Sequence, residues 1–263
     1  MISVLSVAPW FVIGLLAASS AYAADPPLAR ARTLYNAADY DGAIAAAAMA
    51  RGQANTADAA ALVEARAHLE RYRRTADAMD LMAARAALTA TRPALLSPRD
   101  QVDFLIGLGQ SLYLTDLFGS AAELFDTALE RSAALPERDR QLLLDWWATA
   151  LDREAQGAPP ERRARLAAQI ADRMEEELRR DPGSAPANYW LAVAARASGD
   201  LDTAWDAAVA AWLRATLSPA PAQLRADIDR LVVDVLIPER ARVRRETTEA
   251  LRGQWSLIKE EWK

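Results

Sequence analysis

The chain has 263 residues, of which 52% are hydrophobic and 25% charged, and its formal net charge is −5. It has no cysteine and a single histidine, His68, which excludes disulfides, thiolate metal sites and cysteine nucleophiles and leaves one residue for any His-based chemistry. The acidic balance argues against a nucleic-acid surface, which needs a basic stripe. We therefore expect a well-packed globular protein that carries no metal or other cofactor.

The N-terminal segment, residues 1–23, reads MISVLSVAPWFVIGLLAASSAYA and carries no charged side chain. An apolar run is followed by small residues and by Ala21-Tyr22-Ala23, which has the form of a signal-peptidase site. We expect a secretory signal peptide that is cleaved after Ala23, and a mature chain in the periplasm or outside the cell. The alternative is an uncleaved anchor, but Pro9 interrupts an apolar run already shorter than the roughly 20 residues that a membrane span needs.

The rest of the chain is dominated by strong helix formers, namely Ala, Leu, Arg and Glu, and has few β-branched runs. Glycine and proline gather at expected joints, which include Pro93, Pro136, Gly157, Pro182 and Pro238. Segments of 12 to 20 residues between such joints suit helical hairpins. The sequence therefore predicts an all-α fold.

A repeated spacing of small residues supports hairpins. Ala121, Phe125 and Ala128 follow Gly109 after 12, 16 and 19 residues. The same steps occur twice more, as Ala31, Ala43, Ala47, Ala50 and as Ala192, Ala204, Ala208, Ala211. Two antiparallel helices approach closely only where facing residues are small, so we expect Gly109 to face Ala121 and Phe125 to fill the space against the next hairpin.

This pattern resembles the tetratricopeptide repeat (TPR), in the positions just given and in Leu108, Leu129, Asp39-Tyr40, Leu191 and Gly199-Asp200. The resemblance implies a right-handed α-solenoid of antiparallel hairpins. The copies begin 78 and 83 residues apart (109−31 and 192−109), so we expect two further hairpins between them. These would be 62–74 with 77–88 and 141–154 with 162–180, which makes about five hairpins over residues 24–220. A spacing near 40 residues exceeds the usual TPR length of about 34, so a HEAT-like or irregular solenoid is the alternative.

The resemblance also implies a function. Stacked hairpins form a concave surface, lined mainly by the first helix of each hairpin, that takes a protein or peptide partner. The groove-facing candidates are Arg32, Tyr35, Asn36, Gln110, Tyr113, Tyr189 and Arg196. We therefore expect an exported, non-catalytic binding scaffold.

The C-terminal segment, residues 221–263, departs from the repeat and is expected to cap it. Within it, Leu251, Trp255, Ile258 and Trp262 recur at steps of four, three and four, which places them on one helix face. This stripe would either pack against the last repeat, because a solenoid needs a polar outer cap, or dock on a partner or a membrane surface. The mixed charge of the helix disfavours the membrane.

Two further functions remain open. An envelope enzyme or glycan-binding module would use the Trp-rich C-terminal half, because exposed aromatic rings bind sugars and peptides. A self-associating or membrane-tethered assembly factor would use the stripe or an uncleaved N-terminus. The sequence shows no phosphate-binding Gly-rich loop, zinc-protease helix or G-x-S-x-G motif. Glu64, four residues before His68, is close enough on a helix to contact it, and His68 is expected to be a surface or half-buried residue and not a catalyst. The clusters of acidic residues are expected to form ion pairs on helix faces.

Overall fold

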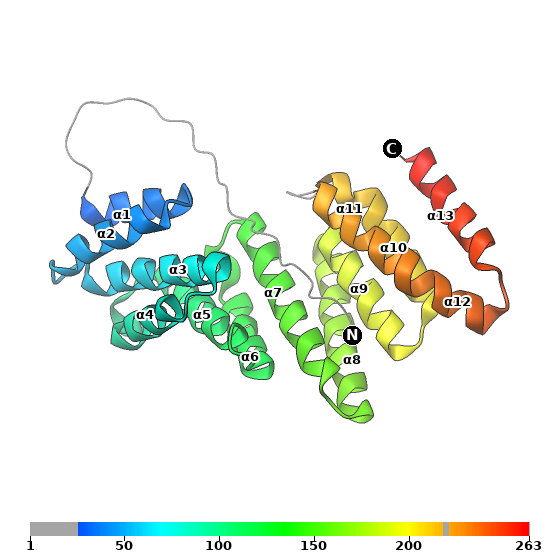
Figure 1. The fold of residues 1–263 in the computed structure, drawn as a ribbon, viewed down its shortest axis with the longest axis horizontal. Helices are drawn as coiled ribbons and strands as arrows, with labels where there is room; N and C mark the ends of the chain where they lie inside the picture. The colour runs from blue at the N-terminus through cyan, green and yellow to red at the C-terminus, as the bar shows by residue number, and fades with distance from the viewer. Residues whose placement is uncertain (1–25, 218–220, 263) are drawn as a thin grey trace. The chain divides into compact units, whose positions relative to one another are not determined.

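The computed structural model describes residues 26–217 and 221–262, and within these ranges every regular element is helical (Figure 1). The all-α prediction is therefore confirmed. The predicted signal peptide, residues 1–23, lies outside the described residues.

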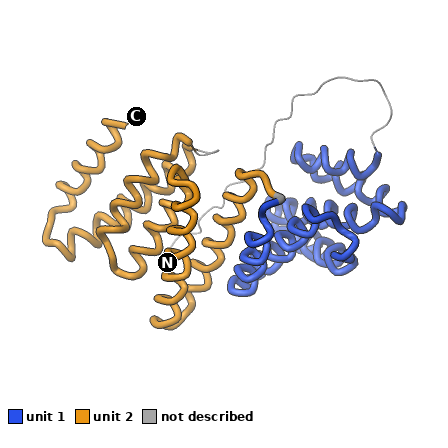
Figure 2. Tube along the Cα trace, turned by 180° about the vertical axis from the view of Figure 1, so that it is seen from behind, with its two compact units in different colours: residues 1–134 blue, residues 135–263 orange. Residues whose placement is uncertain are grey.

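The chain divides into two compact units at residue 134 (Figure 2). Unit 1 contains α1 (Pro27–Asn36), α2 (Tyr40–Arg51), α3 (Ala57–Thr75), α4 (Ala78–Ala90), η1 (Pro93–Leu95), α5 (Pro98–Tyr113), α6 (Phe118–Glu130) and η2 (Ser132–Ala134). Unit 2 contains α7 (Glu137–Gln156), α8 (Pro160–Arg180), α9 (Ala185–Ser198), α10 (Leu201–Arg214), η3 (Ala215–Leu217), α11 (Pro221–Arg230), η4 (Leu231–Leu236), α12 (Ile237–Arg244) and α13 (Thr248–Glu261). The division falls inside the predicted repeat region, and segment 221–263 belongs to the same unit as the last two hairpins.

Each predicted hairpin is present as a pair of packed neighbouring helices: α1–α2, α3–α4, α5–α6, α7–α8 and α9–α10. The tight turns are built from left-handed residues and capping side chains. Ala38, Ala76 and Gly199 have φ of 60°, 55° and 86° and end the first helix of their hairpins. The Asp39 carboxylate then accepts a hydrogen bond from the Gly42 amide, and the Asp200 carboxylate accepts one from the Thr203 amide, both at 3.0 Å. Each aspartate therefore caps the start of the second helix of its hairpin.

Small residues let the paired helices approach, as the spacing predicts. Ala31, Ala43, Ala47 and Ala50 in unit 1 have no exposed surface. Ala192, Ala204, Ala208 and Ala211 in unit 2 are buried in the same way. Alanine at these positions allows close packing of the helix backbones, because a longer side chain would hold the axes apart.

Gly109 makes its close contact with a partner other than the expected one. A Cβ atom at Gly109 would lie 2.5 Å from Cε1 of Phe125, which is fully buried. Glycine is therefore required because the Phe125 ring occupies the side-chain position. Phe125 therefore fills space within its own hairpin, between α5 and α6.

The expected joint at Pro238 is wrong, because the helix continues through this residue. Residues Leu231–Leu236 form a π-helix, in which the Ile237 amide donates to the carbonyl of Val232. Proline lacks an amide hydrogen and its ring clashes with the carbonyl four residues earlier, so a wider turn accommodates it. The chain breaks instead after Arg245, which has φ of 59°, and α13 returns alongside α12 (Figure 1).

Candidate partner-binding faces

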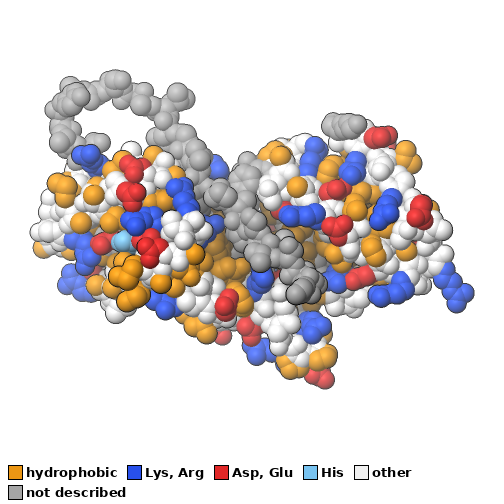
Figure 3. Space-filling model, in the orientation of Figure 1, with side chains coloured by type: hydrophobic (Ala, Val, Ile, Leu, Met, Phe, Trp, Pro, Cys, Tyr) orange, Lys and Arg blue, Asp and Glu red, His pale blue; other side chains and the backbone are white. Residues whose placement is uncertain are grey.

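In unit 1, the first helices α1, α3 and α5 pack side by side and carry a network of charged side chains. Arg32 on α1 donates to both carboxylate oxygens of Asp100 on α5, at 2.8 and 3.0 Å. Arg66 on α3 forms an ion pair with Asp103 on α5 at 3.0 Å. These residues form one polar face, but its charges are already paired within the unit. Figure 3 shows the same intermixing of basic and acidic side chains over the visible surface.

Two of the predicted groove residues in unit 1 are not available to a partner. Tyr35 is 8% exposed, because its ring lies 5.7 Å from that of Tyr40 and under the guanidinium of Arg66 at 4.8 Å. Gln110 is 4% exposed, because α5 packs against α3, α4 and α6 and most of its circumference is covered. Both residues belong to the interior, which corrects their assignment to a groove.

The other unit 1 candidates reach the surface in different degrees. Arg32 and Asn36 are exposed on α1. Tyr113 is half-buried at the end of α5, with its ring edge-on to Phe118 at 5.2 Å between centroids. Because Arg32 is held by Asp100, it presents part of an ion pair to the solvent and not an unsatisfied charge.

In unit 2, the first helices bring together a cluster that the sequence analysis missed. Asp145 on α7 accepts a 2.8 Å hydrogen bond from the indole N–H of Trp190 on α9, and Tyr189 lies edge-on to Trp190 at 5.3 Å. Burial raises the pKa of Tyr189, and the negative charges of Asp227, Asp145 and Asp152 raise it further. We call the surface formed by Asp145, Asp152, Tyr189 and Asp227 the acidic face.

A shared register explains why these residues meet. Asp145 and Asp152 are seven residues apart on α7, so they lie on one side of the helix two turns apart. Tyr189 and Arg196 have the same separation on α9. The pKa of Arg196 is raised mainly by its hydrogen bond to Glu239, with a smaller contribution from the negative charge of Asp152, while the charge of Asp145 contributes to the raised pKa of Tyr189. The seven-residue spacing of aspartates in a Trp-rich helix is the sequence signal that could have revealed this face.

Two carboxylates of the acidic face, those of Asp145 and Asp152, hold their charge at a cost in free energy. Burial raises the pKa of Asp145 to about 6, while the Trp190 hydrogen bond lowers it and the charge of Asp227 raises it. Burial also raises the pKa of Asp152, against the lowering effects of a 3.0 Å hydrogen bond from Gln156 and of the charges of Arg153 and Arg196. The hydrogen-bond donor to Asp145 is a neutral indole, so a cation brought to this face would compensate for the water that burial removes from the carboxylate.

The raised pKa of Asp145 predicts a dependence of stability on pH. The folded state holds this proton up to about pH 6, whereas a carboxyl with the ordinary pKa of 3.8 loses it earlier. Between these values the folded state binds more protons, so the free energy of unfolding falls as the pH rises. Asp145→Asn keeps an acceptor for Trp190 and removes the charge. We expect it to raise the free energy of unfolding by roughly 1–3 kcal/mol at pH 7.5 and by almost nothing at pH 4, measured by urea unfolding.

The matched control for this prediction is Asp172→Asn at an exposed position of α8 in the same unit. It should leave the free energy of unfolding unchanged at both pH values. Equal stability of Asp145→Asn and the parent chain at pH 7.5 would show that the carboxylate is fully solvated.

Arg196 is exposed but is not an independent cation. Its guanidinium donates to both carboxylate oxygens of Glu239 on α12, at distances between 2.7 and 3.2 Å. This bidentate pair ties α9 to α12 within unit 2. The side chain therefore borders the acidic face while serving the packing of the C-terminal segment.

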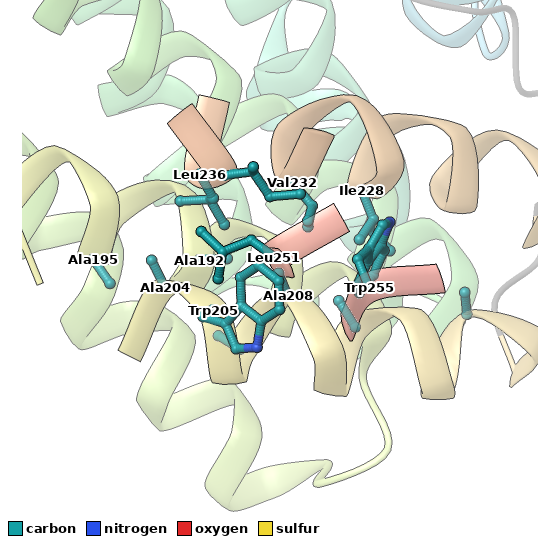
Figure 4. Packing of buried hydrophobic residues seen from close by; sticks show 14 residues of the cluster. Ala192, Ala195, Ala204, Trp205, Ala208, Ile228, Val232, Leu236, Leu251 and Trp255 are labelled. Carbon is teal, nitrogen blue, oxygen red and sulfur yellow. The ribbon is translucent and has the colours of Figure 1, made fainter. Parts of the chain in front are cut away.

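The predicted docking stripe on α13 is mostly interior (Figure 4). Leu251 and Trp255 are each 1% exposed in the core built by α10, α11 and η4, and Ile258 packs against that core. Trp262 is 56% exposed. Leu251 and Trp255 therefore act as capping residues, in line with the first of the two interpretations of the stripe.

Other polar residues singled out from the sequence are held in structural contacts. His68 contacts Asp80 through Nδ1 at 2.7 Å, whereas Glu64 pairs with Arg51 and not with His68. Glu177 pairs with Arg140 at 2.6 Å across α7 and α8, as ion pairing of the acidic clusters predicts.

The tryptophans of unit 2 are largely core residues, in contrast to what a sugar-binding surface needs. Trp147, Trp190 and Trp205 are between 1% and 7% exposed, and Trp146 is half-buried. Over residues 26–217 and 221–262, no set of three or more acidic or histidine side chains is placed to hold a metal ion. In the same ranges no helix is both long and apolar enough to cross a membrane. Comparison of the chain with protein-family models, curated proteins and solved structures finds no match.

Proposed function

We propose that the chain is an exported, non-catalytic scaffold, a right-handed TPR-like α-solenoid, that binds a protein or peptide segment through the acidic face of unit 2. Support comes first from the architecture. Five helical hairpins pack in sequence order within their units, and the first helices α7 and α9 contact each other directly. Such an arrangement presents one continuous surface of side chains to a partner. The uncharged segment 1–23 supports export.

The observation that carries the proposal is that Asp145 and Asp152, two carboxylates with raised pKa, lie on one side of α7 near the half-buried ring of Tyr189. A lysine or arginine from a partner would restore the charge balance of the carboxylates. The Tyr189 ring would supply apolar contact next to them. The partner segment is therefore expected to be basic, and its binding is expected to weaken as salt rises.

The test compares two variants that remove the same charge. Asp145→Asn with Asp152→Asn removes two carboxylates from the acidic face, and Glu175→Gln with Glu176→Gln removes two from exposed positions of α8. Both tagged chains are used to recover binding proteins from envelope extract, followed by quantitative mass spectrometry. We expect the parent chain and the Glu175/Glu176 variant to recover the same proteins in equal amounts. The Asp145/Asp152 variant should recover about tenfold less of them, or less still.

Tyr189→Ala is expected to weaken the same capture by about 1 kcal/mol or more. Recovery of the same proteins at equal yield by all of these variants would reject the acidic face as the binding surface. An isothermal titration of the recovered partner with the parent chain then gives the affinity directly.

A further inference from the structure

The turn that joins α12 to α13, Arg245–Thr247, begins with two residues, Arg245 and Glu246, that suit a helix. Arg245 has φ of 59°. A non-glycine residue adopts this left-handed conformation roughly 5 to 30 times less readily than the right-handed helical one. Ala38, Ala76 and Asp116 share this conformation in the turns of unit 1, whereas the turn between α9 and α10 uses Gly199. Arginine and glutamate are strong helix formers, and neither glycine nor proline interrupts residues 239–252. The bend before α13 is therefore locally disfavoured.

Helix α13 covers part of the apolar core that α10, α11 and η4 form (Figure 4). The Trp255 ring lies edge-on to Trp205 and Trp212, at 6.1 and 5.3 Å between centroids, and Leu251 is buried beside them. Removal of α13 would expose these rings together with Ile228, Val232 and Leu236, which are fully buried. An apolar patch of this kind is not stable in water, so some helix must occupy it.

Two polar contacts set the register of α13 on this surface. The indole N–H of Trp255 donates to Asp229 at 2.7 Å, and the Lys259 ammonium donates to the same carboxylate at 2.6 Å. Lys259 also lies 5.7 Å from the Trp212 ring centroid, within cation–π range. A helix that binds here must therefore carry a tryptophan and, four residues later, a cation. This combination is present in α13 of every copy of the chain.

We propose that the surface accepts α13 from a second copy, in a reciprocal exchange, when Arg245–Thr247 straighten and join α12 and α13 into one helix. The contacts of α13 are the same in the closed and exchanged forms, so the balance between them is set by the hinge and by the chain concentration. In the exchanged form Arg245 takes a helical conformation and no longer carries the cost of the left-handed one. The exchanged form also places Arg242 and Arg245 four residues before Glu246 and Glu249, as ion pairs on a continuous helix.

One contact favours the closed form. Thr247 caps the start of α13 by accepting the Ala250 amide at 3.1 Å through its hydroxyl oxygen, and a continuous helix loses this cap. The exchange rests on the contacts of α13 with α12 and with the core that α10, α11 and η4 form, and it does not require the carboxylates of Asp145 and Asp152.

Two hinge variants test the exchange in opposite directions. Arg245→Gly suits the left-handed conformation and should lower the association constant of the two-chain species by about 25-fold, roughly fivefold for each of two hinges. Thr247→Ala removes the cap and should raise the association constant. The mass in solution is measured by light scattering over a range of concentrations of the full chain, with far-UV circular dichroism to verify the helical fold of each variant.

A pair of charge reversals distinguishes exchange from association through another surface. In the closed chain, Asp229→Arg places a second positive charge beside Lys259, and Lys259→Glu places a second negative charge beside Asp229. A mixture of the two restores both pairs, Arg with Glu and Asp with Lys, only when α13 is exchanged between chains. We expect the mixture to form a two-chain species that contains one of each variant and exceeds what either forms alone. A single-chain mass for the parent, for Thr247→Ala and for the mixture would overturn the proposal. The proposal would also be overturned by a two-chain species whose association constant does not change with Arg245→Gly and which forms no more readily in the mixture than with either variant alone.

Discussion

Replacing Phe125 by alanine is expected to lower the free energy of unfolding of unit 1 by about 3–5 kcal/mol. The ring is fully buried between α5 and α6 and packs directly on the backbone at Gly109. The space it leaves cannot collapse easily, because Ala121, Ala122 and Ala128 around it on α6 are already small. Chemical unfolding followed by far-UV circular dichroism measures the loss.

The Gly109 contact makes this prediction specific. Gly109→Ala places a Cβ atom 2.5 Å from the ring and should destabilise the parent chain by about 1–3 kcal/mol. In the Phe125→Ala background the clash is gone, and alanine should then be neutral or stabilising, since it favours the helix over glycine by about 1 kcal/mol. A double-mutant cycle gives the coupling. Additive effects of the two substitutions would contradict a direct contact between Gly109 and Phe125.

Replacing Trp255 by alanine is expected to lower the free energy of unfolding of unit 2 by about 3–5 kcal/mol. The side chain is 1% exposed, packs on Trp205 and Trp212, and donates its indole hydrogen to Asp229. Its loss removes apolar contact and takes one of the two hydrogen bonds, from Trp255 and Lys259, that Asp229 accepts. Tryptophan fluorescence follows the unfolding, because the tryptophans of the described residues all lie in unit 2.

Trp262→Ala is the matched control on the same helix. Its side chain is 56% exposed, one turn beyond Ile258, so its removal should change the free energy of unfolding by less than about 0.5 kcal/mol. Equal effects of the two substitutions would show that α13 is not an integral part of the core of unit 2.

The hairpins could be predicted because their determinants are local or strictly periodic. Asp39 and Asp200 start helices through their own side chains, and Gly199 ends one through its own backbone freedom. The small residues Ala43 and Ala204 recur at fixed distances from Ala31 and Ala192, which reveals helix contacts without knowledge of the rest of the fold.

The candidate site could be predicted less well, because burial depends on several helices at once. Tyr35 has the spacing of a surface residue but is covered by Tyr40 and Arg66 from its neighbours. Asp145 looks like an ordinary helix aspartate in the sequence. Its pKa is raised because burial among the packed helices keeps water from it, an effect that the charge of Asp227 adds to and the Trp190 hydrogen bond opposes.

The C-terminal segment shows the same division. The stripe of Leu251, Trp255 and Ile258 is evident from periodicity, yet the sequence left open whether it caps the fold or binds a partner. The choice depends on the apolar surface of α10, α11 and η4, which exists only once those helices have packed.

The sequence by itself determined the helices, their pairing into hairpins and the small residues at their contacts, because hydrogen bonding, capping and close approach act between residues near in the chain or at a fixed period. Tertiary structure alone decided that Gly109 makes room for Phe125, that Pro238 lies within a continuous helix, and that Asp145, Tyr189 and Asp227 share one face. These features depend on which side chains from distant segments exclude water from one another, and the free energy of that exclusion is a property of the packed units.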